Sequence, residues 1–225
     1  MSLPMETANK NLLLEGAKTF GIHLDEKALE AFDLYLQELL KWNQKINLTA
    51  IRSEKGIVLK HFLDSLSAHL YLPKHSSLLD IGSGAGFPGI PLKIIQPTSE
   101  MTLIDSVRKK VDFQRHIIRM LGLKGMETFH GRVQDKEICQ SLGGRFDVIL
   151  SRAFSDLQTL LVLSLPFLKE GGLVIAMKGK VASSEIRLLT ETTGSRYRLQ
   201  ETAHLTLPFS TFKRMILLFK KEVSP

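Results

Sequence analysis

One stretch decides the fold: Leu78-Leu79-Asp80-Ile81-Gly82-Ser83-Gly84-Ala85-Gly86, in which an apolar run leads straight into three alternate glycines. Glycine lets the backbone turn sharply from a strand into a helix and come close to a ligand, because no side chain stands in the way. Asp105 ends the next apolar run, 23 positions after Gly82, where a carboxylate accepts hydrogen bonds from a ribose diol. The stretch therefore predicts a nucleotide-binding unit with Gly82, Gly84 and Asp105 as ligand-binding residues.

After Ser77, short apolar runs alternate with helical segments. The runs predict strands at Leu78–Ile81, Met101–Ile104, Met126–Phe129, Phe146–Leu150 and Leu173–Ala176. The segments between them predict helices at Pro88–Ile95, Lys109–Leu121, near Lys136 and at Asp156–Leu168. This alternation is typical of an α/β, Rossmann-like fold, a mostly parallel sheet with helices on both faces. Leu199–Leu207 and Met215–Phe219, joined by a short link, predict an antiparallel pair at the C-terminal edge of the sheet.

The first 75 residues have a helical pattern instead. Apolar side chains recur at steps of three and four from Leu29 to Leu40, which predicts an amphipathic helix with Asp25 as its N-cap. A second helical stretch is predicted from Ile57 to Leu72, before Pro73. We therefore expect residues 1–75 to form an N-terminal helical segment packed on a core domain of residues 76–225.

Composition excludes several classes of protein. The chain has 225 residues, 44% of them hydrophobic, which is enough for a large core. Its single cysteine, Cys139, excludes an internal disulfide and a thiolate metal cage, so we predict no metal site and a reducing, cytoplasmic setting. No apolar run approaches the roughly 18 residues of a membrane span, and the first residues lack the pattern of a signal peptide. We expect a protein that neither enters a membrane nor is exported.

The charge is unevenly distributed. Residues 1–75 contain nine basic and nine acidic residues, whereas residues 76–225 contain 21 and 14, so the net charge of +7 belongs to the second part. A basic face suggests an anionic partner, such as a nucleic acid or a membrane surface. A solvated surface without a partner is the alternative, and charge alone does not decide between them.

The glycine loop discriminates between nucleotide ligands. A dinucleotide fingerprint would need a third glycine at position 87, where Phe87 stands, and Asp80 would repel a pyrophosphate bound at the helix start. S-adenosylmethionine (SAM) carries a sulfonium and an ammonium group and no phosphate, so a carboxylate beside it is favourable. The loop therefore favours SAM over NAD as the cofactor.

Five longer motifs closely resemble the GidB/RsmG family of bacterial 16S rRNA (guanine-7-)-methyltransferases, over about residues 34–220. These motifs are Asp80 to Pro91, Trp42-Asn43-Gln44-Lys45-Ile46-Asn47-Leu48-Thr49, His61-Phe62-Leu63-Asp64-Ser65-Leu66, Asp105-Ser106 and Ser151-Arg152-Ala153-Phe154. The resemblance implies a class I SAM-dependent methyltransferase fold. It also implies transfer of a methyl group from SAM to the seven-position nitrogen of one guanosine in the decoding-region loop of 16S rRNA.

The resemblance further implies which residues border the cofactor. Gly82 and Phe87 would lie along its methionine and ribose, Val133 and Gln134 around its adenine, and Arg152 beside the site. The family usually has Ala-Glu at the positions of Val133-Gln134, which leaves the role of the Gln134 side chain open. Arg152 follows a buried strand, so it needs a partner: the cofactor carboxylate, an RNA phosphate, or Asp105 or Asp156 of the chain itself.

Several cations follow the predicted strands. The candidates for binding RNA phosphates are Arg108, Lys109, Arg132, Lys178 and Lys180. Individually, each is equally compatible with a solvated surface charge. Asn43 is expected to terminate a helix, and His61 and Asp64 are expected to be structural, so no residue is assigned a catalytic role.

The predicted chemistry does not need a general base. The seven-position nitrogen of guanine has a free lone pair and loses no proton, so transfer depends on positioning. The implied partner is 16S rRNA or the small ribosomal subunit, with the chain acting as a monomer. Two alternatives stay open: an NAD(P)-dependent oxidoreductase, which Phe87 disfavours, and a non-catalytic RNA-binding or assembly factor.

Overall fold

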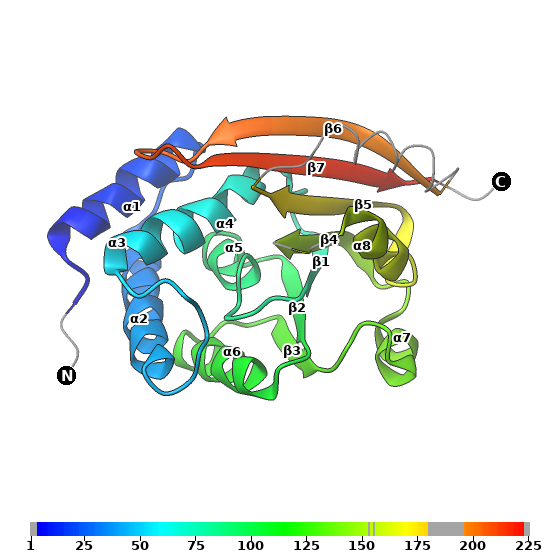
Figure 1. Ribbon diagram of the computed structural model, residues 1–225, viewed down its shortest axis with the longest axis horizontal. Coiled ribbons are helices and arrows are strands. Elements are labelled where there is room, and N and C mark those ends of the chain that lie inside the picture. The colour runs from blue at the N-terminus through cyan, green and yellow to red at the C-terminus, as the bar shows by residue number, and fades with distance from the viewer. Residues whose placement is uncertain (1–3, 153, 155, 180–195, 223–225) are drawn as a thin grey trace.

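The computed structural model describes residues 4–152, 154, 156–179 and 196–222. Within them a seven-stranded sheet has the strand order β3-β2-β1-β4-β5-β7-β6 (Figure 1). The strands are β1 (Ser77–Ile81), β2 (Glu100–Asp105), β3 (Met126–His130), β4 (Phe146–Arg152), β5 (Leu168–Lys178), β6 (Tyr197–Thr206) and β7 (Lys213–Lys221). The first five are parallel, whereas β7 is antiparallel to both β5 and β6. The predicted α/β fold with an antiparallel edge is confirmed.

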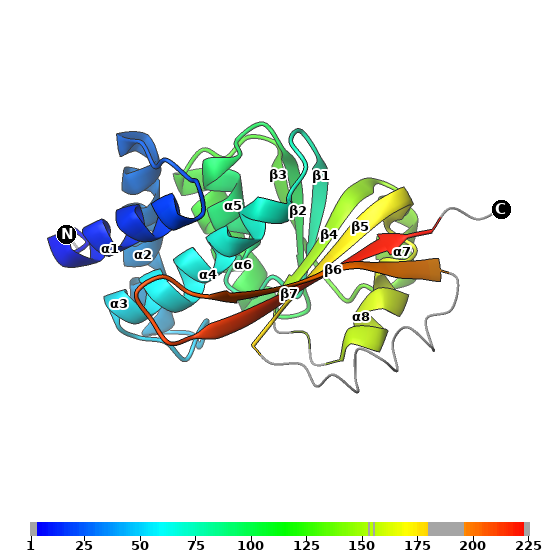
Figure 2. The same cartoon turned by 90° about the horizontal axis from the view of Figure 1, so that it is seen from above.

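Helices cover both faces of the sheet (Figure 2). They are α5 (Gly89–Ile95) and α6 (Arg108–Met120) on one face, and α7 (Lys136–Leu142) and α8 (Leu157–Ser164) on the other. Side chains of a strand alternate between the two faces. Accordingly Leu78 belongs to the hydrophobic core under α5 and α6, and its neighbour Leu79 to the core under α7 and α8. The unbroken apolar strands in the sequence reflect this burial on both sides.

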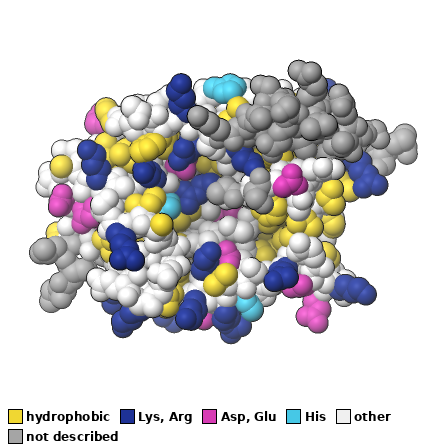
Figure 3. All heavy atoms as spheres, viewed as in Figure 1, with side chains coloured by type: hydrophobic (Ala, Val, Ile, Leu, Met, Phe, Trp, Pro, Cys, Tyr) yellow, Lys and Arg dark blue, Asp and Glu magenta, His cyan; other side chains and the backbone are white. Residues whose placement is uncertain are grey.

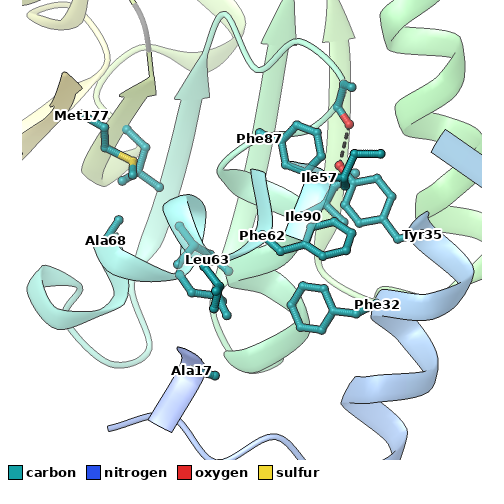
Figure 4. Packing of buried hydrophobic residues seen from close by; sticks show 14 of the residues in the cluster. Ala17, Phe32, Tyr35, Ile57, Phe62, Leu63, Ala68, Phe87, Ile90 and Met177 are labelled. Atoms are coloured by element: carbon teal, nitrogen blue, oxygen red, sulfur yellow. Dashed lines mark hydrogen bonds between the residues drawn. The ribbon is translucent and has the colours of Figure 1, made fainter. Parts of the chain in front are cut away.

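The N-terminal helices share the first of these two cores. In α2 (Glu26–Asn43), the Asp25 side chain caps the helix by accepting from Ala28 N at 2.7 Å, as predicted. Phe32 and Tyr35 of this helix pack against Phe62, with ring centroids 4.9 and 5.5 Å apart (Figure 4). The helix α1 (Thr7–Thr19) also buries Leu13 and Ala17 in this core.

The second predicted helical stretch is a chain of four shorter helices. They are α3 (Glu54–Ile57), the π-helix η1 (Val58–Leu63), α4 (Asp64–Leu66) and the 3-10 helix η2 (Ser67–Tyr71). Apolar periodicity reports a buried face, but it does not distinguish these hydrogen-bond patterns. The stretch ends before Pro73, as predicted.

One predicted helix is too long. The prediction for Asp156–Leu168 is wrong at its C-terminal end, because α8 ends at Ser164 and Leu168 already pairs with Phe146 as the first residue of β5. Pro166 lies between them and cannot supply the backbone N–H that a continuing helix needs. Correspondingly, β5 begins five residues before the predicted Leu173.

Candidate functional site

The glycine loop follows β1 and turns toward α5. Gly82 and Gly84 have φ values of 71° and 60°, a left-handed conformation that disfavours residues with a side chain. A Cβ atom added to either glycine would meet no atom of a described residue within 4 Å. The backbone conformation therefore requires glycine at both positions. The absence of side chains there leaves room for a ligand to approach the loop.

Asp105, the last residue of β2, is fixed to this loop. Its Oδ2 accepts from Gly84 N at 2.8 Å, and its Oδ1 accepts from Val107 N at 2.8 Å. Each carboxylate oxygen has two lone pairs, so both retain capacity for a ligand hydroxyl group. The structure thus brings Gly84 and Asp105 together, although they are 21 positions apart.

A depression of about 280 Å³ opens at the carboxyl ends of the parallel strands, and we call it the open pocket. Its lining consists of Ile81, Gly82, Ile104, Asp105, Ser106, Gly131, Arg132, Val133, Gln134, Phe154 and Leu163. Four of the predicted cofactor residues, Gly82, Asp105, Val133 and Gln134, therefore meet in one place. Phe154 and Leu163 were not predicted here, and only the position of Phe154 within a family motif pointed to it.

Phe87 and Arg152, also predicted to border the cofactor, do not line the open pocket. Phe87 is 3% exposed, and its ring stacks on His61 at 4.4 Å between centroids and on Tyr35 at 5.2 Å. Tyr35 in turn donates a hydrogen bond of 2.6 Å to the carbonyl of Ala85 in the glycine loop, the dashed line in Figure 4. Phe87 thus supports the loop from behind.

Arg152 belongs to a second group of side chains, which we call the arginine cluster: Arg152, Arg214, Asp64 and His61. The Arg152 guanidinium donates to Lys60 O at 3.0 Å and to His61 Nδ1 at 3.0 Å, and lies 3.4 Å from Asp64 Oδ2. Arg214 Nε donates to the other carboxylate oxygen of Asp64 at 2.8 Å. Neither Asp105 nor Asp156 is the partner of Arg152, so that part of the sequence interpretation is wrong.

His61 is a neutral hydrogen-bonding residue in this cluster. Burial, together with the nearby Arg152 cation, lowers its pKa to about 3. Because Nδ1 accepts from Arg152, the proton lies on Nε2, which donates to Thr49 Oγ1 at 2.7 Å. The structural role expected for His61 is consistent with these bonds.

Asp80 lies between the open pocket and the arginine cluster and is fully buried. Its Oδ2 accepts from Gly89 N at 2.9 Å, but its Oδ1 has no hydrogen-bond partner among the described residues. Burial raises the pKa of this carboxyl to about 7. An unsatisfied buried carboxylate oxygen beside the glycine loop suits a cationic ligand group, and it would repel a pyrophosphate.

The predicted RNA-binding cations have different surroundings. Arg132 borders the open pocket, whereas Lys109 lines a separate pocket of about 490 Å³ with Trp42 and Lys45. Arg108 lies 3.4 Å from Asp112, and Lys178 donates to the carbonyl of Phe154. Lys180 lies outside the described residues.

Two further properties concern the described part of the chain. No group of three or more His, Cys, Asp or Glu side chains there is arranged to hold a metal ion. None of the helices within it has the length and apolar character that crossing a membrane requires.

The strand order, the glycine loop after β1 and the carboxylate after β2 define a Rossmann-like, SAM-dependent methyltransferase. More specifically, the chain belongs to the GidB family: the sequence model described as rRNA small subunit methyltransferase G matches residues 28–214. The resemblance found in the motifs is thereby confirmed, and the oxidoreductase alternative is not supported.

Named relatives agree with this assignment. The chain is 42% identical over 221 residues to ribosomal RNA small subunit methyltransferase G of Geobacter metallireducens, covering 97% of this chain and 99% of the relative. It is 40% identical to the protein of the same name from Acetivibrio thermocellus, covering 94% and 88% of the two chains. A solved SAM-dependent methyltransferase from Aquifex aeolicus shares the fold, with a TM-score of 0.57 at 16% identity, covering 73% of this chain and 93% of that one.

Proposed function

We propose that the protein transfers a methyl group from SAM to the seven-position nitrogen of a guanosine in the decoding-region loop of 16S rRNA. Membership of the family of rRNA small subunit methyltransferase G is the observation that carries this proposal. The substrate is the rRNA itself or the small ribosomal subunit, and the protein acts as a cytoplasmic monomer. The helical residues 1–75 and the domain of residues 76–225 would form this enzyme together.

The residues of the open pocket fit the proposed cofactor. Asp105 would accept hydrogen bonds from the ribose hydroxyl groups, and Gly82 allows the ligand to approach the backbone. Val133 and Gln134 would border the adenine. The carboxylate of Asp80, which is buried beside the glycine loop with Oδ1 unpaired, would attract the ammonium group without lining the pocket. Gly84 shapes the loop, whereas Phe87 and Arg152 would act from behind it.

SAM, when bound, supplies an electrophilic methyl group on a sulfonium. The guanine nitrogen already has its lone pair, so the residues of the chain have no proton to remove before attack. Their contribution is to hold the two reactants in line. The loop, anchored by Asp105, Tyr35 and the buried Phe87, is suited to this because its backbone is fixed on three sides.

Methyl transfer to unmodified RNA tests the proposal. The protein would be incubated with SAM labelled in the methyl group and, separately, with deproteinised 16S rRNA and with 30S particles that lack the modification. We expect label in 7-methylguanosine after digestion to nucleosides. Label in another nucleoside would reject the proposed target atom, and RNA binding without any transfer would favour the assembly factor.

A further inference from the structure

The turn between β6 and β7 exposes an aromatic side chain at a strained position. Phe209 is 63% exposed and has a φ of 56°, which is unfavourable for a residue with a bulky side chain. The turn is nevertheless well bonded, because Leu207 N donates to Phe212 O at 2.9 Å and Ser210 Oγ accepts from Phe212 N at 3.2 Å. The fold therefore holds an apolar ring in water at a cost in both hydration and backbone conformation.

This turn projects from the same edge of the sheet as the open pocket. In the antiparallel pair of β5 and β7, Met215 lies opposite Lys178, the last residue of β5. Residues 207–212 thus extend beyond the carboxyl end of β5, and the turn reaches the N-terminal helices beside α3 (Figures 1 and 2). Lys60 of η1 also contacts it, with Nζ 4.3 Å from the centre of the Phe212 ring.

A series of ion pairs connects the start of β7, next to the turn, to the carboxyl end of β4. Arg214, the second residue of β7, lies 2.8 Å from Asp64, which in turn lies 3.4 Å from Arg152 at the end of β4. Asp64 is buried and faces two arginines, so it leaves this region net positive. The turn is consequently anchored to the structure that supports the glycine loop.

Two cations, Lys60 and Lys213, lie beside the C-terminal part of the turn. Lys213 is exposed and forms no ion pair with a described residue, and Lys60 lies over Phe212. Figure 3 shows basic side chains, with hydrophobic ones among them, from the upper left to the lower edge of the face drawn there. Aromatic rings interleaved with cations suit single-stranded RNA, whose bases stack on the rings while its phosphates meet the cations.

We propose that residues 207–213 and Lys60 form a docking site for an unpaired segment of RNA, with a base stacked on Phe209 and a phosphate beside Lys213. The inference rests on the proposed function only in taking RNA as the substrate. It assigns the strained turn a role in binding RNA, separate from binding the cofactor.

Two variants of Phe209 test this site. Phe209→Ala removes the ring, and Phe209→Gly removes it while also relieving the positive φ. Because stacking contributes about 1 to 3 kcal/mol per base, we expect both variants to bind deproteinised 16S rRNA at least about fivefold more weakly. Phe209→Gly should also unfold at a higher urea concentration than the wild type, whereas Phe209→Trp should retain RNA binding.

Controls separate this site from general effects on the protein. Val162→Ala removes an equally exposed apolar side chain, 60% exposed on α8, and should leave RNA affinity unchanged. Affinity for SAM, measured by calorimetry, should be the same in all these variants. Lys213→Ala should reduce the slope of log affinity against log salt by about 0.7, the value for one phosphate contact on a single strand.

RNA binding is measured without SAM, so the inference does not depend on turnover. Weaker RNA binding by Phe209→Gly in a protein that methylates nothing would support the docking site and reject the proposed function. Wild-type affinity in Phe209→Gly would overturn the docking site, even if methyl transfer proceeds. So would a loss of affinity seen with 30S particles but not with deproteinised rRNA, since that result indicates a ribosomal protein as the partner.

Discussion

Two groups of polar side chains lie at one edge of the sheet, the open pocket and the arginine cluster, and they differ in how far their hydrogen-bonding groups are paired within the chain. In the open pocket, Asp105 is bonded to backbone N–H groups, and no described residue lies within 4 Å of the Cβ position of Gly82. In the arginine cluster, Arg152 is bonded to three acceptors of the chain, and Asp64 is paired on both oxygens. The open pocket has acceptor capacity left for a ligand, whereas the carboxylate of the arginine cluster is already paired on both oxygens within the chain.

This difference separates binding from support. A group that retains unused acceptors contributes its free energy when a ligand arrives, whereas a buried ion pair with complete partners contributes to holding the fold or its geometry. Phe87 of the glycine loop stacks on His61 of the arginine cluster, with the ring centroids 4.4 Å apart. The arginine cluster is therefore in contact with the glycine loop through Phe87.

The largest expected effect comes from breaking the arginine cluster. Asp64→Ala leaves Arg152 and Arg214 without their shared carboxylate, and removing one member of a buried ion pair costs about 3 to 5 kcal/mol. We expect the free energy of unfolding, measured in urea, to fall by about that amount. Glu15→Ala is the control, since it breaks an ion pair with Lys18 whose side chains are more than half exposed.

That control should lose at most about 1 kcal/mol. If Asp64→Ala loses no more than Glu15→Ala, the cluster does not hold the fold, and the contrast between support and binding fails. If the loss is large, the exposed fraction of the carboxylate accounts for the difference, because the two pairs have similar short distances of 2.6 and 2.8 Å.

The same two groups show what the sequence could predict. The open pocket depends on a local motif, a glycine loop and a carboxylate 21 positions apart on neighbouring strands, and the parallel arrangement brings them together. The arginine cluster joins residues 88 and 150 positions apart, from a π-helix region, the end of β4 and the antiparallel edge. A sequence shows that Arg152 needs a counter-ion, but the partner depends on how the N-terminal helices pack.

The elements follow the same rule. Strands buried on both faces were predicted because their apolar runs have a length and a position that few alternatives share. The internal hydrogen bonding of Val58–Leu63 and the end of α8 at Ser164 depend on neighbouring packing and on Pro166. Periodicity alone therefore located these segments without defining their type or their ends.

A smaller effect tests the open pocket itself. Gly82→Ala places a side chain at a φ of 71°, which costs about 1 to 2 kcal/mol of stability. Gly21 is a matched control, because it has the same φ of 71° and equally open space around its Cβ position, yet it follows α1. We expect Gly82→Ala and Gly21→Ala to lose similar stability in urea.

Only the pocket variant should lose affinity for SAM, because its new Cβ lies where the ligand would approach the backbone. We expect calorimetry to show binding weaker by about tenfold or more for Gly82→Ala, and wild-type binding for Gly21→Ala. Equal affinities in both variants would place the cofactor somewhere other than the open pocket.

The last test concerns Asp80, the carboxyl between the two groups. Its pKa is about 7 in the folded protein, mainly because of burial, against an ordinary value of 3.8. Between these values the folded protein retains a proton that the unfolded chain has released, so the free energy of unfolding falls as pH rises through this window. Asp80→Asn cannot titrate and retains an oxygen that accepts from Gly89 N.

The difference in stability between wild type and Asp80→Asn should therefore shift against the wild type from about pH 4 to about pH 7. The affinity of the wild type for SAM should rise as pH rises, since the ionised carboxylate is the form that attracts an ammonium group. The affinity of Asp80→Asn should not change with pH in this range. Calorimetry at about pH 5.5 and about pH 7, where the ammonium group of SAM stays charged, measures this. If both proteins gain the same affinity, the unpaired Oδ1 does not face the ligand, and Asp80 belongs with the arginine cluster as a supporting residue.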